Sequence, residues 1–187
     1  MKTKILKITG PAAIMAIMML SFTACDEFAP TIKVPFESDS EFSITAEEAT
    51  LKSGESYPLL HEWVYTESLS ALISDKGGNP EKIRESNITG VTFTLVNADA
   101  GNLADIISHL ELKIDEHPPV SKTLVARSLE ISSNSISFEI ILDDILDYVV
   151  NDSGMIFSLY GNANKEALEE DLEVKISVSS EMVVQLL

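Results

Sequence analysis

The sequence predicts a mainly β fold, an antiparallel β-sandwich that carries two or three short inserted helices. Apolar and polar residues alternate in several segments after residue 88, which is typical of strands with one buried face. Clusters of Asn, Asp, Gly and Pro separate these segments, as turns between antiparallel strands require. Helical spacing of apolar residues is confined to short stretches. We expect residues 41–187 to form one domain, long enough to enclose a core.

The first half of this domain predicts a strand, a helix and a second strand. Alternation at residues 42–46 predicts a short first strand. Apolar residues at helical spacing predict a helix between residues 66 and 74, which the sequence Gly77-Gly78-Asn79-Pro80 should end. Residues 88–96 are rich in β-branched side chains and predict the next strand.

Turn residues at 97–102 lead into the second half, and Asn102 is placed to cap a helical turn over residues 103–107. Asp143 is predicted to be the N-cap of a further helix that ends at Val150 and buries Ile145, Leu146 and Val149. The other alternating segments predict strands at residues 110–115, 123–131, 135–141, 155–161 and 172–178, the last extended by 182–187.

Six or seven such strands fit a sandwich that is immunoglobulin-like in architecture. The alternatives are an α+β sheet with helices on one face and a β-barrel.

The first 24 residues have the composition of an export signal. Lys2, Lys4 and Lys7 precede an apolar run at residues 11–20, which is shorter than the roughly 20 residues that span a bilayer. Small residues at positions 23 and 24 then precede Cys25, the single cysteine of the chain.

This segment resembles the lipobox of bacterial lipoproteins, although Phe22 stands where leucine is usual. The resemblance implies that residues 1–24 are a cleaved signal peptide and that Cys25 is the acylated first residue of the mature chain. Two or more acyl chains anchor a protein stably to a bilayer. An uncleaved anchor helix, or an ordinary export signal with an incidental cysteine, is the alternative.

Residues 25–40 contain two prolines and several polar and acidic residues, and they predict a flexible tether between lipid and domain. Asp26 and Glu27 directly follow the cysteine. In some lipoproteins an acidic stretch there marks export to the cell surface, and in others an aspartate marks retention at the inner membrane. We expect an envelope protein at the outer membrane, exposed on the cell surface.

Composition excludes several partners. The chain has 13 basic and 30 acidic residues; without the three leader lysines, ten basic residues leave the mature part with a net charge near −20. So acidic a chain is expected to be a poor partner for anionic molecules such as nucleic acid or acidic lipid headgroups. With eight glycines and no GxGxxG pattern, nucleotide binding is not expected. A lone cysteine forms no intramolecular disulfide.

Three catalytic or metal-binding patterns begin and then fail. His61-Glu62 starts a zinc-protease motif, but Tyr65 stands where the second histidine is needed. Gly54-Glu55-Ser56 starts a nucleophile elbow, but Pro58 replaces its closing glycine. The turn from Asn97 to Gly101 lacks the glycine and the glutamate of a calcium loop.

The remaining candidates are acidic, histidine and aromatic side chains. Asp143, Asp144, Asp147 and residues 169–171 offer carboxylates of the kind that glycoside hydrolysis uses, but helix capping and solvation also explain them. The three histidines, His61, His109 and His117, show no metal-ligand spacing. Tyr57, Trp63 and Tyr65 are either core residues or a contact patch for sugar or protein.

Residues 66–187 resemble small exported lipoproteins of uncharacterised function, in which a helical turn leads into a strand and an Asp-initiated helix leads into another. We therefore expect a non-enzymatic, lipid-anchored binding or structural accessory without cofactor or metal, contacting protein or glycan. A carrier of apolar cargo between its sheets, and a hydrolase with an unrecognised acidic site, are the alternatives.

Overall fold

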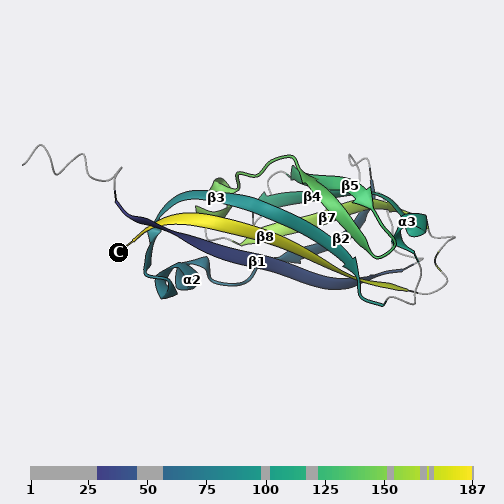
Figure 1. Cartoon of the computed structure of the whole chain (residues 1–187), viewed down its shortest axis with the longest axis horizontal. Helices are drawn as coiled ribbons and strands as arrows, with labels where there is room; N and C mark the ends of the chain where they lie inside the picture. The colour runs from purple at the N-terminus through teal and green to yellow at the C-terminus, as the bar shows by residue number, and fades with distance from the viewer. Residues whose placement is uncertain are drawn as a thin grey trace, which may run out of the picture.

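The computed structural model describes residues 29–45, 57–97, 102–116, 122–150, 154–164, 168 and 171–186. The predicted leader, the lipidation residue Cys25, Ser56 and His117 lie outside the described residues. The described part is elongated, with its strands running along the long axis (Figure 1). β1 begins and β8 ends at the same end, next to α2, whereas α3 lies at the opposite end (Figure 1).

The fold is mainly β and antiparallel, with three short helices, as the sequence predicts. The strands are β1 (Thr31–Ile44), β2 (Leu59–Val64), β3 (Gly78–Leu95), β4 (Ile107–Glu116), β5 (Thr123–Ile131), β6 (Ser135–Ile140), β7 (Met155–Ala163) and β8 (Leu172–Leu186). The helices are α2 (Leu69–Asp75), α3 (Leu103–Ile106) and α4 (Leu146–Val150).

All eight strands belong to one hydrogen-bonded sheet, in the order β1-β8-β3-β6-β5-β4-β7-β2. The sheet folds over on itself, so that its two edge strands, β1 and β2, come next to each other (Figure 1). Because the sheet is continuous and nearly closed, the architecture lies between the predicted two-sheet sandwich and the alternative barrel.

The predicted tether over residues 25–40 is too long. β1 begins at Thr31 and pairs with β8 from Thr31 through Ile44 without interruption. Val34, Phe36 and Ser38 on its inner face are buried, whereas the residues between them are exposed. This alternation of buried and exposed residues is present in the sequence, but prolines at positions 30 and 35 obscure it. Pro35 is tolerated because β1 is an edge strand, where a missing N–H disrupts no second ladder.

Two other predicted boundaries move because backbone partners are available elsewhere. Gly78 does follow the end of α2, but it also begins β3, and Pro80 falls where the pairing of β3 with β8 is irregular. Asp143 does not cap α4, because residues 143–145 hydrogen-bond to β3 instead. The Asp144 carboxylate accepts from the Leu146 N–H at 3.0 Å and takes the capping role.

The interior is one contiguous apolar cluster that extends from α2 to α3. β8 supplies it most regularly, with alternate side chains buried along its whole length. β7 differs, because every residue from Met155 to Gly161 is buried on one face or the other. Gly161 on β7 lets the neighbouring strands β2 and β4 approach β7 closely, since a Cβ there would lie 2.8 Å from the His109 carbonyl oxygen and 2.8 Å from the Leu60 side chain.

Candidate functional site: the β1–β2 seam and the pocket beside it

Side chains, rather than a strand ladder, join the two edges of the sheet. The Trp63 indole N–H on β2 donates to the Ser38 Oγ on β1 at 2.9 Å. Two residues further along each strand, the Ser40 Oγ and the His61 Nε2 lie 2.8 Å apart. β1 and β2 occupy opposite ends of the strand order, so these bonds bridge a gap in the sheet. We call this gap, with its four bridging residues, the seam.

Four stacked rings line the seam. The ring of Phe42 lies parallel to that of His61 at 4.1 Å between centroids, His61 stacks on Trp63 at 5.7 Å, and Trp63 stacks on Phe157 at 5.2 Å. Burial lowers the pKa of His61 below its ordinary value, against the opposing effect of nearby Glu62. The imidazole is therefore neutral at pH 7 and serves as a half-buried stacking ring.

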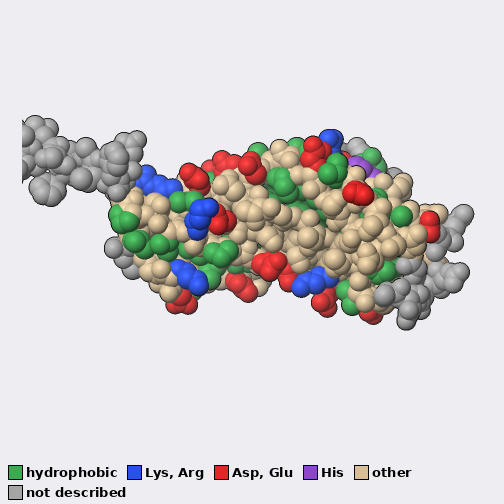
Figure 2. All heavy atoms as spheres, viewed as in Figure 1, with side chains coloured by type: hydrophobic (Ala, Val, Ile, Leu, Met, Phe, Trp, Pro, Cys, Tyr) green, Lys and Arg blue, Asp and Glu red, His purple; other side chains and the backbone are tan. Residues whose placement is uncertain are grey.

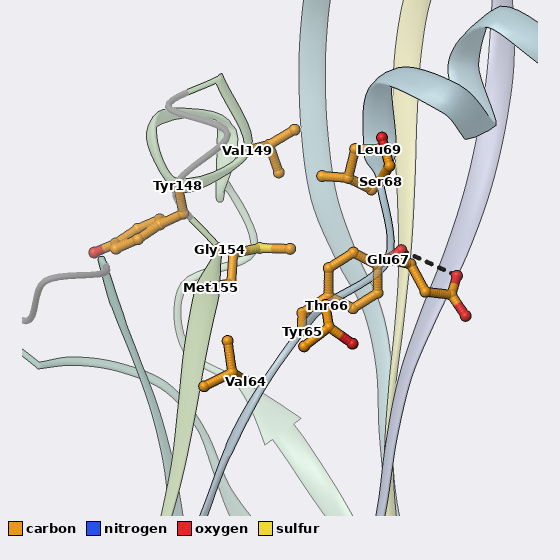
Figure 3. A pocket seen from close by; sticks show the side chains of 10 residues that line it. All are labelled: Val64, Tyr65, Thr66, Glu67, Ser68, Leu69, Tyr148, Val149, Gly154 and Met155. Atoms are coloured by element: carbon orange, nitrogen blue, oxygen red, sulfur yellow. Dashed lines mark hydrogen bonds between the residues drawn. The ribbon is translucent and has the colours of Figure 1, made fainter.

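A pocket of about 400 Å³ lies beside the seam, with the segment that joins β2 to α2 on one side and residues of α4 and the start of β7 on the other (Figure 3). Tyr65 forms one wall and packs against Phe36 with 5.6 Å between centroids. The Tyr65 hydroxyl donates to the Glu67 carboxylate at 3.4 Å. Burial, reinforced by Glu67, raises the pKa of Tyr65 to about 12, so the phenol stays protonated.

The rest of the pocket combines apolar and hydroxyl groups. It is lined by Val64, Thr66, Ser68, Leu69, Val149, Gly154, Met155 and the ring of Tyr148. Tyr148 turns its hydroxyl away from the pocket (Figure 3), where it donates to the Thr123 Oγ1 at 2.8 Å. Val64 on the wall is 45% exposed, and Val150 beside Val149 is 58% exposed. The pocket is therefore open and partly apolar.

A second hollow, of about 370 Å³, shares residues 64–67 with the pocket and reaches the outer edge of β1. Glu37, Asp39 and Glu67 contribute carboxylates to it. The Asp39 carboxylate is 2.6 Å from the Lys175 ammonium, which lowers the pKa of Asp39 and raises that of Lys175. Asp39 is thus already neutralised by a partner within the chain.

A network around Lys122 covers the outer face of β7. The Lys122 ammonium donates to Glu62 at 2.8 Å, to the Ser158 Oγ at 2.9 Å and to the Tyr160 hydroxyl at 2.9 Å. Burial alone lowers the pKa of Lys122, but the hydrogen bonds to Glu62 and Tyr160 outweigh it and raise the pKa. All three N–H donors are used, and the serine is fully buried.

This arrangement of serine, lysine and tyrosine resembles a nucleophile with its base, but its chemistry does not fit that role. A base must be able to lose its proton near neutral pH, and the Lys122 ammonium is held in its charged form. Ser158 also donates its own proton to Glu62 at 2.9 Å and is out of reach of solvent. The network therefore satisfies buried polar groups over β7.

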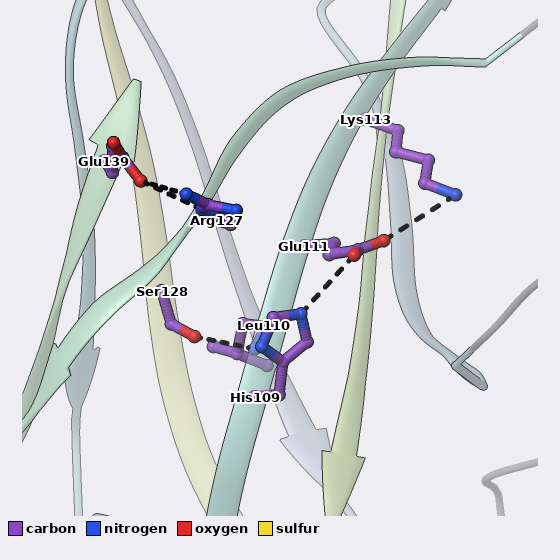
Figure 4. A network of polar contacts seen from close by, with 7 residues as sticks. All are labelled: His109, Leu110, Glu111, Lys113, Arg127, Ser128 and Glu139. Carbon is purple, nitrogen blue, oxygen red and sulfur yellow. Dashed lines mark hydrogen bonds and ion pairs between the residues drawn. The ribbon is translucent and has the colours of Figure 1, made fainter. Parts of the chain in front are cut away.

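A further polar network lies on β4, β5 and β6 (Figure 4). Glu111 lies between His109, at 3.4 Å, and Lys113, at 3.8 Å. The Arg127 guanidinium on β5 pairs with Glu139 on β6 at 2.7 Å, and both side chains are about half exposed. Exposed pairs of this kind contribute up to about 1 kcal/mol, so we assign them to the surface rather than to a site.

Of the three predicted aromatic residues, Trp63 lies on β2, and Tyr57 and Tyr65 lie just outside its two ends. Trp63 lies in the seam, Tyr65 is 6% exposed and forms the pocket wall, and Tyr57 lies before the strand, with its ring 4.4 Å from that of His109. Two of them therefore belong to the seam and pocket, and Tyr57 lies at the other end of β2.

Other sequence candidates have local structural roles. The amide of Asn97 bonds the backbone at residues 171 and 173. Asn102 caps α3, as predicted, by accepting from the Ala104 N–H at 3.1 Å. Asp143 accepts from the Asp144 N–H at 3.1 Å. Within the described ranges, no group of three or more His, Cys, Asp or Glu side chains is placed to hold a metal ion.

Sequence reasoning did not find the seam serines or the Lys122 network. Ser38 and Ser40 were assigned to a tether, and Lys122 is 36 and 38 residues from Ser158 and Tyr160. Alternation along β1 is the one signal that could have placed the serines on a strand. In the part of the chain that the structure describes, no helix has both the length and the apolar character needed to cross a bilayer.

Comparisons with known proteins assign no family. No family model matches the chain, and no curated protein matches it. Solved structures that resemble it include a chain of the Israeli acute paralysis virus full particle, with 10% identity, a TM-score of 0.35, and coverage of 100% of this chain and 86% of that one. A chain of the empty Turnip Yellow Mosaic Virus particle has 14% identity, a TM-score of 0.24, and coverage of 100% and 89%. Likeness at this level carries no functional argument.

Proposed function

We propose that this chain is a lipid-anchored, non-enzymatic protein of the bacterial cell envelope that binds a protein or glycan partner at the outer membrane. Its anchor is the acylated Cys25, in keeping with the lipobox that residues 22–25 resemble. Its binding surface is the pocket beside the seam, together with the exposed apolar side chains of Val64 and Val150.

The observation that carries this proposal is the composition of the pocket. It has an open shape, a volume of about 400 Å³, an aromatic wall and several hydroxyl groups. Exposed apolar side chains at a concave surface are typical of contact sites, and aromatic residues are enriched there. Tyr65 packs against Phe36 and donates to Glu67, so a partner would meet a buried ring that already has contacts within the chain.

The state of the reactive side chains supports a binding role over catalysis. Lys122 is charged and saturated with acceptors, Ser158 is buried, and Tyr65 keeps its proton. Glycoside hydrolysis uses two carboxyl groups, and the pocket lining contains one, that of Glu67. In the adjoining hollow, Asp39 is paired with Lys175 and Glu37 accepts from the Ser179 hydroxyl. The contiguous interior cluster also gives no support to the alternative of a carrier that holds apolar cargo between its layers.

The anchor and the binding surface are tested separately. Intact mass spectrometry of the full chain extracted from membranes should show loss of residues 1–24 and acyl chains on Cys25, and an unmodified thiol would contradict the anchor. A glycan array and cell-surface crosslinking should then give binding that the substitution Val64→Glu abolishes. The matched control is Leu129→Glu, at a site 70% exposed on β5. Equal loss in both variants, or saturable turnover of any substrate, would overturn the binding role.

A further inference from the structure

The position of β1 sets how far the folded body can lie from the bilayer, once Cys25 carries the lipid as proposed above. A tether over residues 25–40 could reach about 55 Å when fully extended. Because β1 begins at Thr31, only five peptide units join Cys25 to Pro30, and these span about 18 Å at most. The end of the molecule at which β1 begins must therefore lie close to the lipid headgroups.

This end is held firmly by the rest of the fold. The Leu186 N–H at the close of β8 donates to the Pro30 carbonyl oxygen at 2.9 Å. α2 packs onto the same end, since a Cβ at Gly78 would lie 2.9 Å from the Ile73 side chain and 3.3 Å from that of Ile32. We define the tether end as residues 29–35, 73–85 and 181–186.

The tether end differs from the rest of the protein in charge. It holds four cations, Lys33, Lys76, Lys82 and Arg84, and four carboxylates, Asp75, Glu81, Glu85 and Glu181. Its net charge is therefore zero, whereas the mature chain as a whole has a net charge near −20 from ten basic and 30 acidic residues. Among the other residues that the structure describes, acidic residues outnumber basic ones, so the acidic excess of the described part lies outside the tether end.

The same end exposes apolar side chains among its cations (Figure 2). Leu186 is 39% exposed, Pro30 is exposed, and Ile32 and Ile83 are partly so. Apolar side chains bordered by lysine and arginine are typical of surfaces that meet a membrane interface, where the long side chains reach the headgroups. Elsewhere the acidic body would be repelled by an anionic bilayer.

From the short connection between Cys25 and β1, the zero net charge of the tether end and its exposed apolar side chains, we infer that the tether end is a membrane-docking face. It lies on the headgroup layer, and the opposite end, with α3 and the β5–β6 turn, points away from the bilayer. The pocket beside the seam is lined in part by Ser68 and Leu69, at the start of α2. Because α2 packs onto the tether end, a partner is met close to the membrane.

Label quenching on the full lipidated chain tests the docking face. With Cys25 acylated, an introduced cysteine is the single free thiol, so a fluorophore can be attached at Thr31→Cys in the tether end or at Leu129→Cys near the β5–β6 turn. In vesicles of phosphatidylcholine with about one third phosphatidylglycerol and a nitroxide lipid, we expect the first label to lose at least about half of its fluorescence and the second to be unaffected. Equal quenching of both labels would overturn the inference.

A longer tether separates docking from mere confinement. Inserting about 20 flexible Gly/Ser residues between Glu27 and Phe28 gives the connection an average span of roughly 25–30 Å. If the face itself binds lipid, the Thr31→Cys label stays the more strongly quenched of the two. If the two labels are quenched equally in the extended chain, the short connection alone held the tether end near the bilayer, and the inference of a docking face is wrong.

The charges are tested on the same extended chain. Replacing Lys33, Lys76, Lys82 and Arg84 by Gln leaves four uncompensated carboxylates, so preferential quenching should be lost in the anionic vesicles and retained in pure phosphatidylcholine. The control, Arg127→Gln on β5, should change nothing. Retention of the preference by the fourfold variant in anionic vesicles would contradict the assigned role of the cations.

Vesicle flotation distinguishes this inference from the proposed function. If the wild type floats with vesicles and Cys25→Ser does not, the lipid anchor is supported. Equal quenching of the Thr31→Cys and Leu129→Cys labels would then refute the docking face and leave the anchor standing. If Cys25→Ser floats as well as the wild type and mass spectrometry finds Cys25 of the wild type unmodified, the proposed anchor is wrong and the inference falls with it. If Cys25 of the wild type is acylated, flotation of Cys25→Ser reports lipid binding by the tether end itself.

Discussion

The substitution Gly161→Ala should destabilise this protein by overpacking the contact between β7 and its two neighbours. A Cβ at residue 161 would meet the Leu110 side chain, would lie 2.8 Å from the Leu60 side chain and, above all, would lie 2.8 Å from the His109 carbonyl oxygen. The ends of the two leucine side chains can move, but the carbonyl is held in the ladder between β4 and β7. Overpacking in a close-packed interior costs about 1–3 kcal/mol, and a fixed backbone atom puts this site at the upper end.

We therefore expect a loss of about 2–3 kcal/mol in the free energy of unfolding, equivalent to a fall of about 5–10 °C in Tm for a chain of this size. Urea unfolding followed by the fluorescence of Trp63, the single tryptophan, measures it directly. Because Trp63 lies in the seam, its native emission should shift as well if β2 is displaced from β7.

Gly90→Ala is the matched control. Gly90 also lies in a strand, but a Cβ there meets nothing within 4 Å. Its effect should stay within about 0.5 kcal/mol of zero. If both substitutions cost the same, the loss reflects glycine in strands generally, and the close approach of β4 and β7 at Gly161 would be refuted.

Three further predictions concern titratable groups. The pKa of His61 is lowered in the folded protein, so the contribution of His61 to stability is present above pH 6.5, the ordinary pKa of histidine, and is lost as pH falls. The urea midpoints at pH 7.5 and pH 5.5 should therefore differ less in His61→Gln than in the wild type. The raised pKa of Tyr65, about 12, adds stability below pH 10 that is lost between pH 10 and 12, so Tyr65→Phe should flatten the alkaline limb of the stability curve; an unchanged limb would contradict the burial of the phenol. Lys122→Met strands Glu62 and Ser158 and should cost about 2–3 kcal/mol in urea unfolding, whereas Lys76→Met at an exposed site should cost almost nothing.

Strand prediction succeeded where one face of the strand meets the interior and the other meets solvent. β8 shows this alternation clearly, and β5, whose burial is less regular, still has the predicted bounds, residues 123–131. β2 is not predicted because it is short and none of its residues is fully buried, with Glu62 and Val64 exposed. The first half of β3 was missed because Gly78 and Pro80 read as breakers, although an irregular stretch of the ladder accommodates them.

The candidate site was predicted only in part. Trp63 and Tyr65 belong to the cluster of aromatic residues that the sequence offers as core or contact patch, and the structure places Trp63 in the seam and Tyr65 in the pocket wall. Their partners could not be found, because Ser38 and Phe36 lie 25 and 29 residues earlier on the other edge of the sheet. Contact between the two edges depends on how far the sheet curls, a property of all eight strands together.

Local patterning determined the mainly β class, most of the strands and the cap of α3, since the period of apolar residues and the chemistry of turns act over a few residues. Residue order alone also supports the lipidated cysteine, because an export signal is read as a linear segment. The tertiary structure decided where β1 begins, how the seam closes, and that the residues of the tether end, with zero net charge, come together at one end of the body. These depend on hydrogen bonds and packing between strands that are up to about 150 residues apart in the chain, and such long-range pairings leave no local mark in the sequence.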